Sequence, residues 1–288
     1  MTLKQRLAKD RILVAPGVYD ALTALIAEQA GAESVFLSGA AIAYTRFGRP
    51  DIGLVSMSEV ADTIAAVCDR ISIPIVVDAD NGFGNALNVQ RTVRVFERMG
   101  ANALQLEDQT LPKRCGHLDG KTLISKQEMT GKIKAACDAR AGDDTLIIAR
   151  TDAIAVEGFD VALERAEDYV EAGADMLFIE APQSVEEFNQ ISAHFSRHVP
   201  LMANMVEGGK SPVVDAAALE TIGFSFVVFP GGIVRAIAAT ARDYYNNLIE
   251  QGSNDAFRSR MFDFAGLNGL IGTDRMLNDG RRYDKGAP

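Results

Sequence analysis

The chain has 288 residues, and 29 Lys and Arg against 39 Asp and Glu give it a formal net charge of −10. This charge disfavours nucleic acids and anionic membranes as partners, and the longest uncharged apolar stretch, residues 223–234, is too short for a membrane span of roughly 20 residues. Three cysteines without disulfide-frame or metal-ligand spacing indicate reduced thiols, so we expect a cytoplasmic protein.

Short β-rich apolar runs alternate with helical periodicity along the chain. Ser58 is the expected N-cap of one helix, residues 160–172 form another, and Gly31, Gly100 and Gly173 each end a helix. Eight strand–helix units predict the α/β class and a (β/α)8 TIM barrel. The expected strands are residues 12–15, 34–38, 73–80, 103–107, 146–152, 176–181, 200–205 and 224–230.

No low-complexity or Pro/Gly/Ser-rich stretch divides the chain. We therefore expect residues 1–288 to form a single barrel domain, because such a barrel takes roughly 250 residues. The helical pattern continues past the eighth strand to residue 251 and through 257–270. Residues from about 240 to 288 are thus expected to be a C-terminal helical extension that packs against another subunit.

Polar residues close several of the expected strands. Side chains two residues apart on a strand point to the same face, so three strand ends each present a polar pair. A (β/α)8 barrel builds its active site from the carboxyl ends of its strands. The three pairs are Asp78 and Asp80, Gln105 and Glu107, and Arg150 and Asp152.

Asp78 and Asp80 are two carboxylates that converge on one spot, which is unfavourable unless a cation or proton lies between them. Oxygen ligands without nearby His or Cys favour Mg2+ or Mn2+. The alternative is a pair of helix-capping or solvated acids. Glu107 at the end of the next strand counts against that alternative.

A loop after the fourth strand carries the sequence KRCGH, residues 113–117. Three basic neighbours predict a lowered pKa for the thiol of Cys115, which suits a proton donor or nucleophile. A solvated basic loop with an incidental cysteine is the alternative. Cys68 and Cys137 lie on expected helices and are interpreted as packing residues.

Small residues follow the second strand at Ser38, Gly39 and Ala40, where a ligand carboxylate can approach backbone N–H groups. A tight turn would use the same residues. Arg150 has the geometry to clamp a carboxylate in a bidentate manner, although an ion pair with Glu180 would look the same in the sequence.

Seven segments carry a family resemblance over nearly the whole chain. They occur in the order found in the isocitrate lyase/phosphoenolpyruvate mutase superfamily, and the KRCGH loop is specific to its carbon–carbon lyase branch. The chain looks most similar to 2-methylisocitrate lyases and 2,3-dimethylmalate lyases. The segments are SGAAIAYTRFGRPDIGLVSMSE, VVDADNGFGN, LQLEDQ, PKRCGH, IIARTDA, FIEAP and MANMVEGG.

The resemblance implies a role for each matching residue. The metal site would use Asp78 and Asp80, with Asp51 and Glu107 holding metal-bound waters. The catalytic residues would be Cys115, Arg150 and Glu180, with Cys115 as the acid on a mobile loop. The substrate contacts would be Ser38, Gly39, Ala40, Gly116, His117, Asn204 and Arg235. The family also implies a homotetramer in which subunits exchange their C-terminal helices.

Two positions bear on the substrate. Phe36 stands where 2-methylisocitrate lyases have a tyrosine proposed to act in proton chemistry, and nothing in the sequence indicates that Tyr44 replaces it. Arg235 matches an arginine that binds the distal carboxylate in those enzymes, which favours a substrate with an extra carboxylate. A surface ion pair is the alternative for Arg235.

These observations predict an Mg2+-dependent carbon–carbon lyase that cleaves a 2-hydroxy di- or tricarboxylate, of the 2-methylisocitrate or 2,3-dimethylmalate type, into an α-keto acid such as pyruvate and a carboxylate. Alternatives within the superfamily are oxaloacetate hydrolysis, decarboxylation, and P–C bond chemistry on phosphonopyruvate. Gly-Gly pairs at 208–209 and 231–232 keep a sugar-phosphate barrel enzyme open. A non-catalytic scaffold would leave the strand-end acids without a role.

Overall fold

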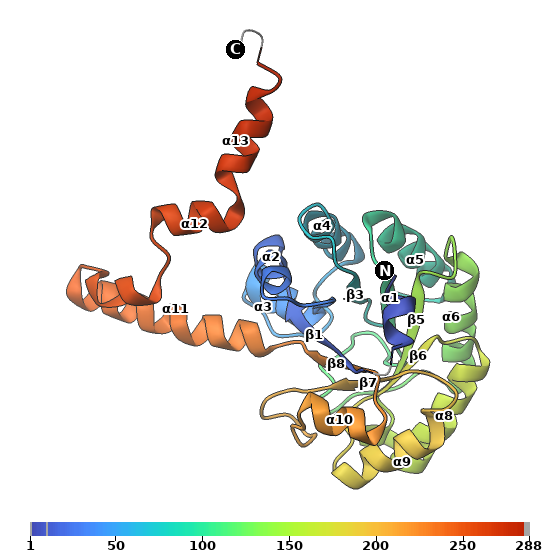
Figure 1. Cartoon of the computed structure of the whole chain (residues 1–288). Helices are drawn as coiled ribbons and strands as arrows, with labels where there is room; N and C mark the ends of the chain where they lie inside the picture. The colour runs from blue at the N-terminus through green and yellow to red at the C-terminus, as the bar shows by residue number, and fades with distance from the viewer. Residues whose placement is uncertain (1, 10, 285–288) are drawn as a thin grey trace. The chain divides into compact units, whose positions relative to one another are not determined.

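The computed structural model of the chain describes residues 2–9 and 11–284 and divides into two compact units, Met1–Val234 and Arg235–Pro288. Among the described residues of the first unit, eight parallel strands close into a barrel in chain order (Figure 1). The predicted (β/α)8 barrel is confirmed. The strands are β1 (Leu13–Val18), β2 (Val35–Leu37), β3 (Ile75–Asp78), β4 (Ala103–Glu107), β5 (Leu146–Thr151), β6 (Met176–Ile179), β7 (Leu201–Asn204) and β8 (Phe226–Phe229).

Helices connect the strands and surround the barrel (Figure 1). Each strand except the last is followed by at least one helix before the next strand begins, which is the arrangement that parallel pairing requires. The helices of this unit are α1 (Leu3–Leu7), α2 (Ala21–Gln29), α3 (Gly39–Phe47), α4 (Met57–Cys68), α5 (Ala86–Met99), α6 (Lys126–Ala139), α7 (Ile154–Glu157), α8 (Phe159–Glu171), α9 (Val185–Phe195) and α10 (Ala216–Ile222).

Alternation along the strands separates two hydrophobic clusters. The smaller cluster consists mainly of side chains from one face of the strands, including Phe36, Val76 and Phe178. The larger cluster consists of side chains from the other face, including Val77, packed against the surrounding helices. The first set fills the barrel interior, because alternate residues of a barrel strand point inward. Positions two residues further along these strands therefore open onto the carboxyl end of the barrel.

The helix ends agree with the sequence in most places. Gly31, Gly100 and Gly173 have φ of +92°, +108° and +107°, the left-handed conformation expected after a helix. The Ser58 prediction is wrong, because α4 begins earlier and Ser56 is its N-cap. Ser56 Oγ accepts from the N–H of Glu59, whose carboxylate accepts from the Ser56 N–H at 2.8 Å, which completes a capping box.

In the second unit, all regular structure of the described residues is helical. This unit holds most of α11 (Gly232–Gln251), a 3-10 helix at Asp255–Arg260, α12 (Phe264–Ile271) and α13 (Thr273–Arg281). The helical continuation to residue 251 is confirmed. None of the helices in the described part of the chain has the length and apolarity that crossing a bilayer requires.

Candidate active site

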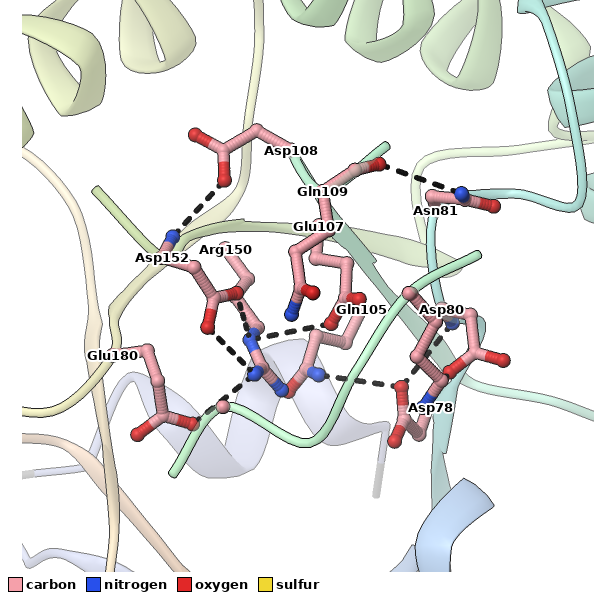
Figure 2. A network of polar contacts seen from close by, with 12 residues as sticks. Asp78, Asp80, Asn81, Gln105, Glu107, Asp108, Gln109, Arg150, Asp152 and Glu180 are labelled. Atoms are coloured by element: carbon pink, nitrogen blue, oxygen red, sulfur yellow. Dashed lines mark hydrogen bonds and ion pairs between the residues drawn. The ribbon is translucent and has the colours of Figure 1, made fainter. Parts of the chain in front are cut away.

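The carboxyl ends of the strands bring the sequence-predicted polar residues together. Asp78, Glu107 and Asn204 are the last residues of β3, β4 and β7, Arg150 lies one residue before the end of β5, and Glu180 follows β6 directly. Each occupies the inward parity of its strand, two residues beyond an interior position such as Val76, Ile148, Phe178 or Met202. The strand-end prediction is therefore confirmed as a placement (Figure 2).

Asp78 and Asp80 share one spot on the rim. The N–H of Asp80 donates to Asp78 Oδ1 at 3.2 Å, and Gln105 Nε2 donates to the same oxygen at 3.4 Å. Asp80 has a left-handed φ of +47°, which turns the chain back toward Asp78. A Cβ placed on Gly39 would lie 3.2 Å from Asp78 Oδ2 and 3.6 Å from Asp80 Oδ1, so the start of α3 closely borders both acids.

The carboxylates of Asp51, Asp78, Asp80 and Glu107 influence one another and form what we call the acidic cluster. Burial changes the acidity of this cluster. Burial raises the pKa of Asp80 to about 6, against the opposing effect of Lys113 and with further repulsion from Asp78 and Asp51. Burial also raises the pKa of Glu107 well above its usual range, although Arg150 opposes that shift. Carboxylates this crowded favour a proton or a cation between them.

The residues around Asp78 and Asp80 fit a hard divalent cation. Asp80 Oδ1 and Glu107 Oε1 are buried and accept no hydrogen bond from the residues that the structure describes, although Lys113 Nζ forms an ion pair with Asp80 Oδ1 at 2.6 Å. Within the described ranges no three His, Cys, Asp or Glu side chains form a complete metal cage. Mg2+ does not need one, because it retains waters and uses one or two carboxylates.

Arg150 is the centre of a buried ion-pair network (Figure 2). Its guanidinium contacts Asp152 Oδ2 at 2.9 Å, Glu180 Oε2 at 3.3 Å and Glu107 Oε2 at 3.4 Å. Asn204 Nδ2 donates to the same Glu180 oxygen at 3.1 Å. The ion pair with Glu180, which the sequence left as an alternative, is present. The carboxylates of Asp152, Glu180 and Glu107 together fix the guanidinium at the rim.

The loop between β4 and α6 covers this network. A Cβ on Gly116 would lie 2.5 Å from Arg150 Nη2 and 2.8 Å from Glu180 Oε2, so the loop backbone lies directly on both side chains. His117 Nε2 is 3.6 Å from Glu180 Oε1, and the Cys115 N–H donates to the carbonyl of Asp51 at 3.2 Å. The predicted residues of this loop are thus at the site.

The prediction of a lowered thiol pKa is wrong. Burial raises the pKa of Cys115, and a hydrogen bond from the His117 backbone only partly offsets it. The basic neighbours serve other partners: Lys113 contacts Asp51 at 2.5 Å and Asp80 at 2.6 Å. Burial lowers the pKa of His117, with Glu180 opposing, so at neutral pH this imidazole carries little charge and Cys115 remains a protonated thiol.

The remaining predicted residues lie as follows. Ser38 caps α3 by accepting from the Ala41 N–H at 3.2 Å, and Gly39 and Ala40 form the first turn of that helix. The turn is therefore present, and the carboxylate contact stays a prediction. Phe36 is buried in the barrel interior. Arg235 belongs to the second compact unit, and its proposed carboxylate contact stays a prediction.

Two residues of the site escaped the sequence reasoning. Asp108 has the opposite parity to Glu107 and points toward the helices, where Oδ2 accepts from Thr151 Oγ1 at 2.7 Å and Tyr169 OH at 2.9 Å. Strand parity would have indicated this direction, but not its partners. Lys121, a loop lysine, is buried against Asp152, and no local sequence pattern distinguishes it from a solvated lysine.

Comparison with known proteins matches nearly the whole chain to the superfamily that its sequence segments resemble. The phosphoenolpyruvate phosphomutase family matches residues 3–249. A 2,3-dimethylmalate lyase from Eubacterium barkeri is 38% identical over 284 residues, covering 99% of this chain and 98% of the relative. A 2-methylisocitrate lyase from Aeropyrum pernix is 45% identical over 274 residues, covering 94% and 87%.

Solved structures agree with this result. A 2,3-dimethylmalate lyase superposes with a TM-score of 0.93 at 31% identity, covering 99% of this chain and 94% of the other. Oxaloacetate acetylhydrolase in complex with 3,3-difluorooxalacetate superposes with a TM-score of 0.93 at 30% sequence identity, covering 99% of this chain and 97% of the other. Phosphonopyruvate hydrolase in complex with oxalate and Mg2+ superposes with a TM-score of 0.87 at 31% sequence identity, covering 99% of this chain and 100% of the other.

The chain belongs to the phosphoenolpyruvate mutase/isocitrate lyase superfamily, as its sequence segments indicated. It is an enzyme, and within this superfamily it is a lyase. The enzyme prediction is confirmed over the non-catalytic scaffold.

Proposed function

We propose that the protein is an Mg2+-dependent carbon–carbon lyase that cleaves a 2-hydroxy di- or tricarboxylate of the 2-methylisocitrate or 2,3-dimethylmalate type. The products are an α-keto acid, such as pyruvate, and a smaller carboxylate. The observation that carries the proposal is the position of the Cys115 loop, whose Gly116 lies directly on Arg150 and Glu180 beside the acidic cluster. A half-buried, protonated thiol at that place is suited to protonate a carbanion.

The metal would be held by Asp78 and Asp80, with Asp51 and Glu107 binding its waters, and Mn2+ should substitute for Mg2+. When bound, it supplies electrostatic stabilisation of the negative charge that develops on substrate oxygens. The support is the buried oxygens of Asp80 and Glu107 that lack hydrogen bonds among the described residues. Phosphonopyruvate hydrolase, which this chain resembles, binds Mg2+ and oxalate.

The proposed bond changes use the protein groups at the barrel rim. The proton of the 2-hydroxyl passes to a carboxylate that contacts Arg150, such as that of Glu180 at 3.3 Å, which releases it to water when the products leave. The C2–C3 bond then breaks, C2 becomes the keto carbon, and the electron pair remains on C3. Cys115 donates its thiol proton to C3, and the thiolate regains a proton from water after the loop opens.

Binding of the substrate uses the backbone and fixed polar side chains. Ser38, Gly39 and Ala40 present the start of α3 to the carboxylate of the keto-acid half. Asn204, already bonded to Glu180, and His117 border the same space. Arg235 would hold a distal carboxylate of the leaving half, which extends the proposal to substrates with three carboxylates.

The test is product analysis. The protein with Mg2+ is incubated with 2-methylisocitrate, 2,3-dimethylmalate and other 2-alkylmalates, and the keto acid released is identified by mass spectrometry. Release of an α-keto acid from one of them, at a rate that needs Mg2+, supports the proposal. Turnover of oxaloacetate alone to oxalate and acetate would favour a hydrolase instead, a candidate supported by the likeness to oxaloacetate acetylhydrolase.

We further propose a homotetramer in which subunits exchange C-terminal helices, with residues 240–288 as the exchanged part of a single 1–288 domain. The second unit exposes large apolar side chains, including Ile249 at 83%, Phe264 at 87% and Met276 at 70%, and such surfaces usually mark contacts with another chain. Sedimentation equilibrium tests the assembly, and Phe264→Glu should shift it toward smaller species. A wild-type monomer would contradict the proposal.

A further inference from the structure

Lys121 is a loop lysine whose ammonium is buried. Its side chain is 2% exposed, and Nζ forms an ion pair at 2.9 Å with Asp152 Oδ1, which belongs to a side chain with no exposure. Lysine side chains normally extend to keep their charge in water, and burying an ammonium is favourable only with close, well-placed partners. The position of Lys121 therefore requires a structural or functional reason.

The base of the loop is fixed beside Lys121. Gln109 and Leu123 form an antiparallel bridge, and the N–H of Thr110 donates to the carbonyl of Thr122 at 2.9 Å. Lys121 is the first residue inside these pairings. From this fixed base its Nζ also donates a short hydrogen bond to the carbonyl of Gly116, five residues back in the loop.

The carboxylate partner of Lys121 is equally fixed. Asp152 accepts from Arg150 Nε at 2.9 Å and Arg150 Nη2 at 3.1 Å, and its backbone N–H donates to Asp108 Oδ1 at 3.0 Å (Figure 2). Asp152 Oδ1 is therefore shared between Arg150 and Lys121. The ammonium joins the loop peptide next to Cys115 to the carboxylate that orients Arg150.

We propose that Lys121 is a positioning residue that holds the Cys115–Gly116 segment closed over Arg150 and Glu180. The ammonium neutralises Asp152 and fixes the direction of the Gly116 carbonyl at the same time. When the loop opens, Lys121 loses the Gly116 contact, so the closed state alone satisfies all of its partners. The inference rests on the proposed role of the Cys115 loop, but not on the identity of the substrate.

The test measures loop opening through the accessibility of Cys115. The rate of Cys115 alkylation by iodoacetamide, followed by peptide mapping, is compared in wild type and Lys121→Met. Loss of the ammonium should raise this rate at least about tenfold, because an open loop exposes the thiol. In the same variant kcat should fall by about tenfold or more on an active substrate, with little change in KM. In Lys121→Arg, the alkylation rate and kcat should both return most of the way to their wild-type values.

Asp119→Asn is the matched control. Asp119 lies on the same loop and forms an ion pair with Lys210 at 2.6 Å, but its side chain is 93% exposed, so its loss should change the alkylation rate less than about twofold. Lys121→Met with wild-type alkylation would overturn the inference, as would loss of the folded state, which would make Lys121 a purely structural residue. If no substrate is turned over but alkylation rises as expected, the proposed function fails and this inference stands.

Discussion

The Lys113 ammonium lies 2.6 Å from Asp80 Oδ1, so the loop that bears Cys115 is tied to the acidic cluster through a buried ion pair. Lys113 also contacts Asp51 at 2.5 Å, and its pKa is raised well above the usual lysine range because Asp80 and Asp51 outweigh the effect of burial. The positive charge of the loop therefore belongs to the acidic cluster and not to the thiol. Loop position and the charge state of the acidic cluster are linked by this contact.

Removal of the divalent cation should abolish activity. Protein treated with a chelator is expected to be inactive and to recover with Mg2+ or Mn2+, because Asp78 and Asp80 share one spot on the rim. Asp80→Ala should lose activity with the added metal and keep its circular dichroism spectrum, since rim residues contribute chemistry more than packing. Full turnover by chelated protein in metal-free buffer would contradict this prediction.

Cys115→Ser should lower kcat by roughly two to four orders of magnitude, the usual contribution of one positioned acid. The serine hydroxyl has a similar size but is a far weaker acid than the thiol. Oxalate binding with Mg2+, measured by calorimetry, should be retained. Cys68→Ser is the matched control, because that half-buried thiol lies on α4 and should leave kcat within about twofold. Retention of most activity by Cys115→Ser would favour hydrolysis or decarboxylation.

The pH dependence of the thiol follows from its environment. Burial raises the pKa of Cys115, so the thiol should stay protonated through neutral pH and its alkylation should rise with a midpoint above the ordinary value of about 8.5. As the proton donor it is active below that raised pKa, and kcat/KM should decline only at higher pH. A midpoint for alkylation below about 8 would show that the loop acidifies the thiol after all.

The buried acid behind the site should matter for stability. Tyr169 OH donates to Asp108 Oδ2 at 2.9 Å, and Tyr169→Phe would remove one donor from a buried carboxylate. The expected loss is about 1–3 kcal/mol in the free energy of unfolding, measured in urea. Tyr283→Phe, at an 83% exposed position, should change it by less than about 0.5 kcal/mol. Equal effects of the two variants would disagree with this role for Asp108.

Local sequence patterns predicted the fold because each depends on neighbouring residues. Strand parity placed Asp78, Glu107 and Arg150 on the inward face, and the positive φ of Gly100 matched its place after a helix. The start of α4 was misplaced by two residues because Ser56 and Ser58 are both suitable caps, and only the partner Glu59 distinguishes them.

The electrostatics of the site could not be predicted in the same way. The pKa of Cys115 depends on burial and on where Lys113 points, and Lys113 pairs with acids that are 33 and 62 residues away in the chain. The burial of Lys121 likewise depends on Asp152, which lies 31 residues further along. Such contacts arise only once the loop has folded over the barrel rim.

The most direct test of the proposed lyase activity is the reaction run in D2O with Mg2+ and the best substrate of the 2-alkylmalate and 2-methylisocitrate panel. Cleavage with protonation of the leaving fragment predicts one α-keto acid per carboxylate, with a single deuterium on the former C3 of the carboxylate. Cys115→Ser should slow the appearance of both products together. Release of CO2, or of oxalate and acetate from oxaloacetate with no cleavage of any 2-hydroxy acid, would contradict the account.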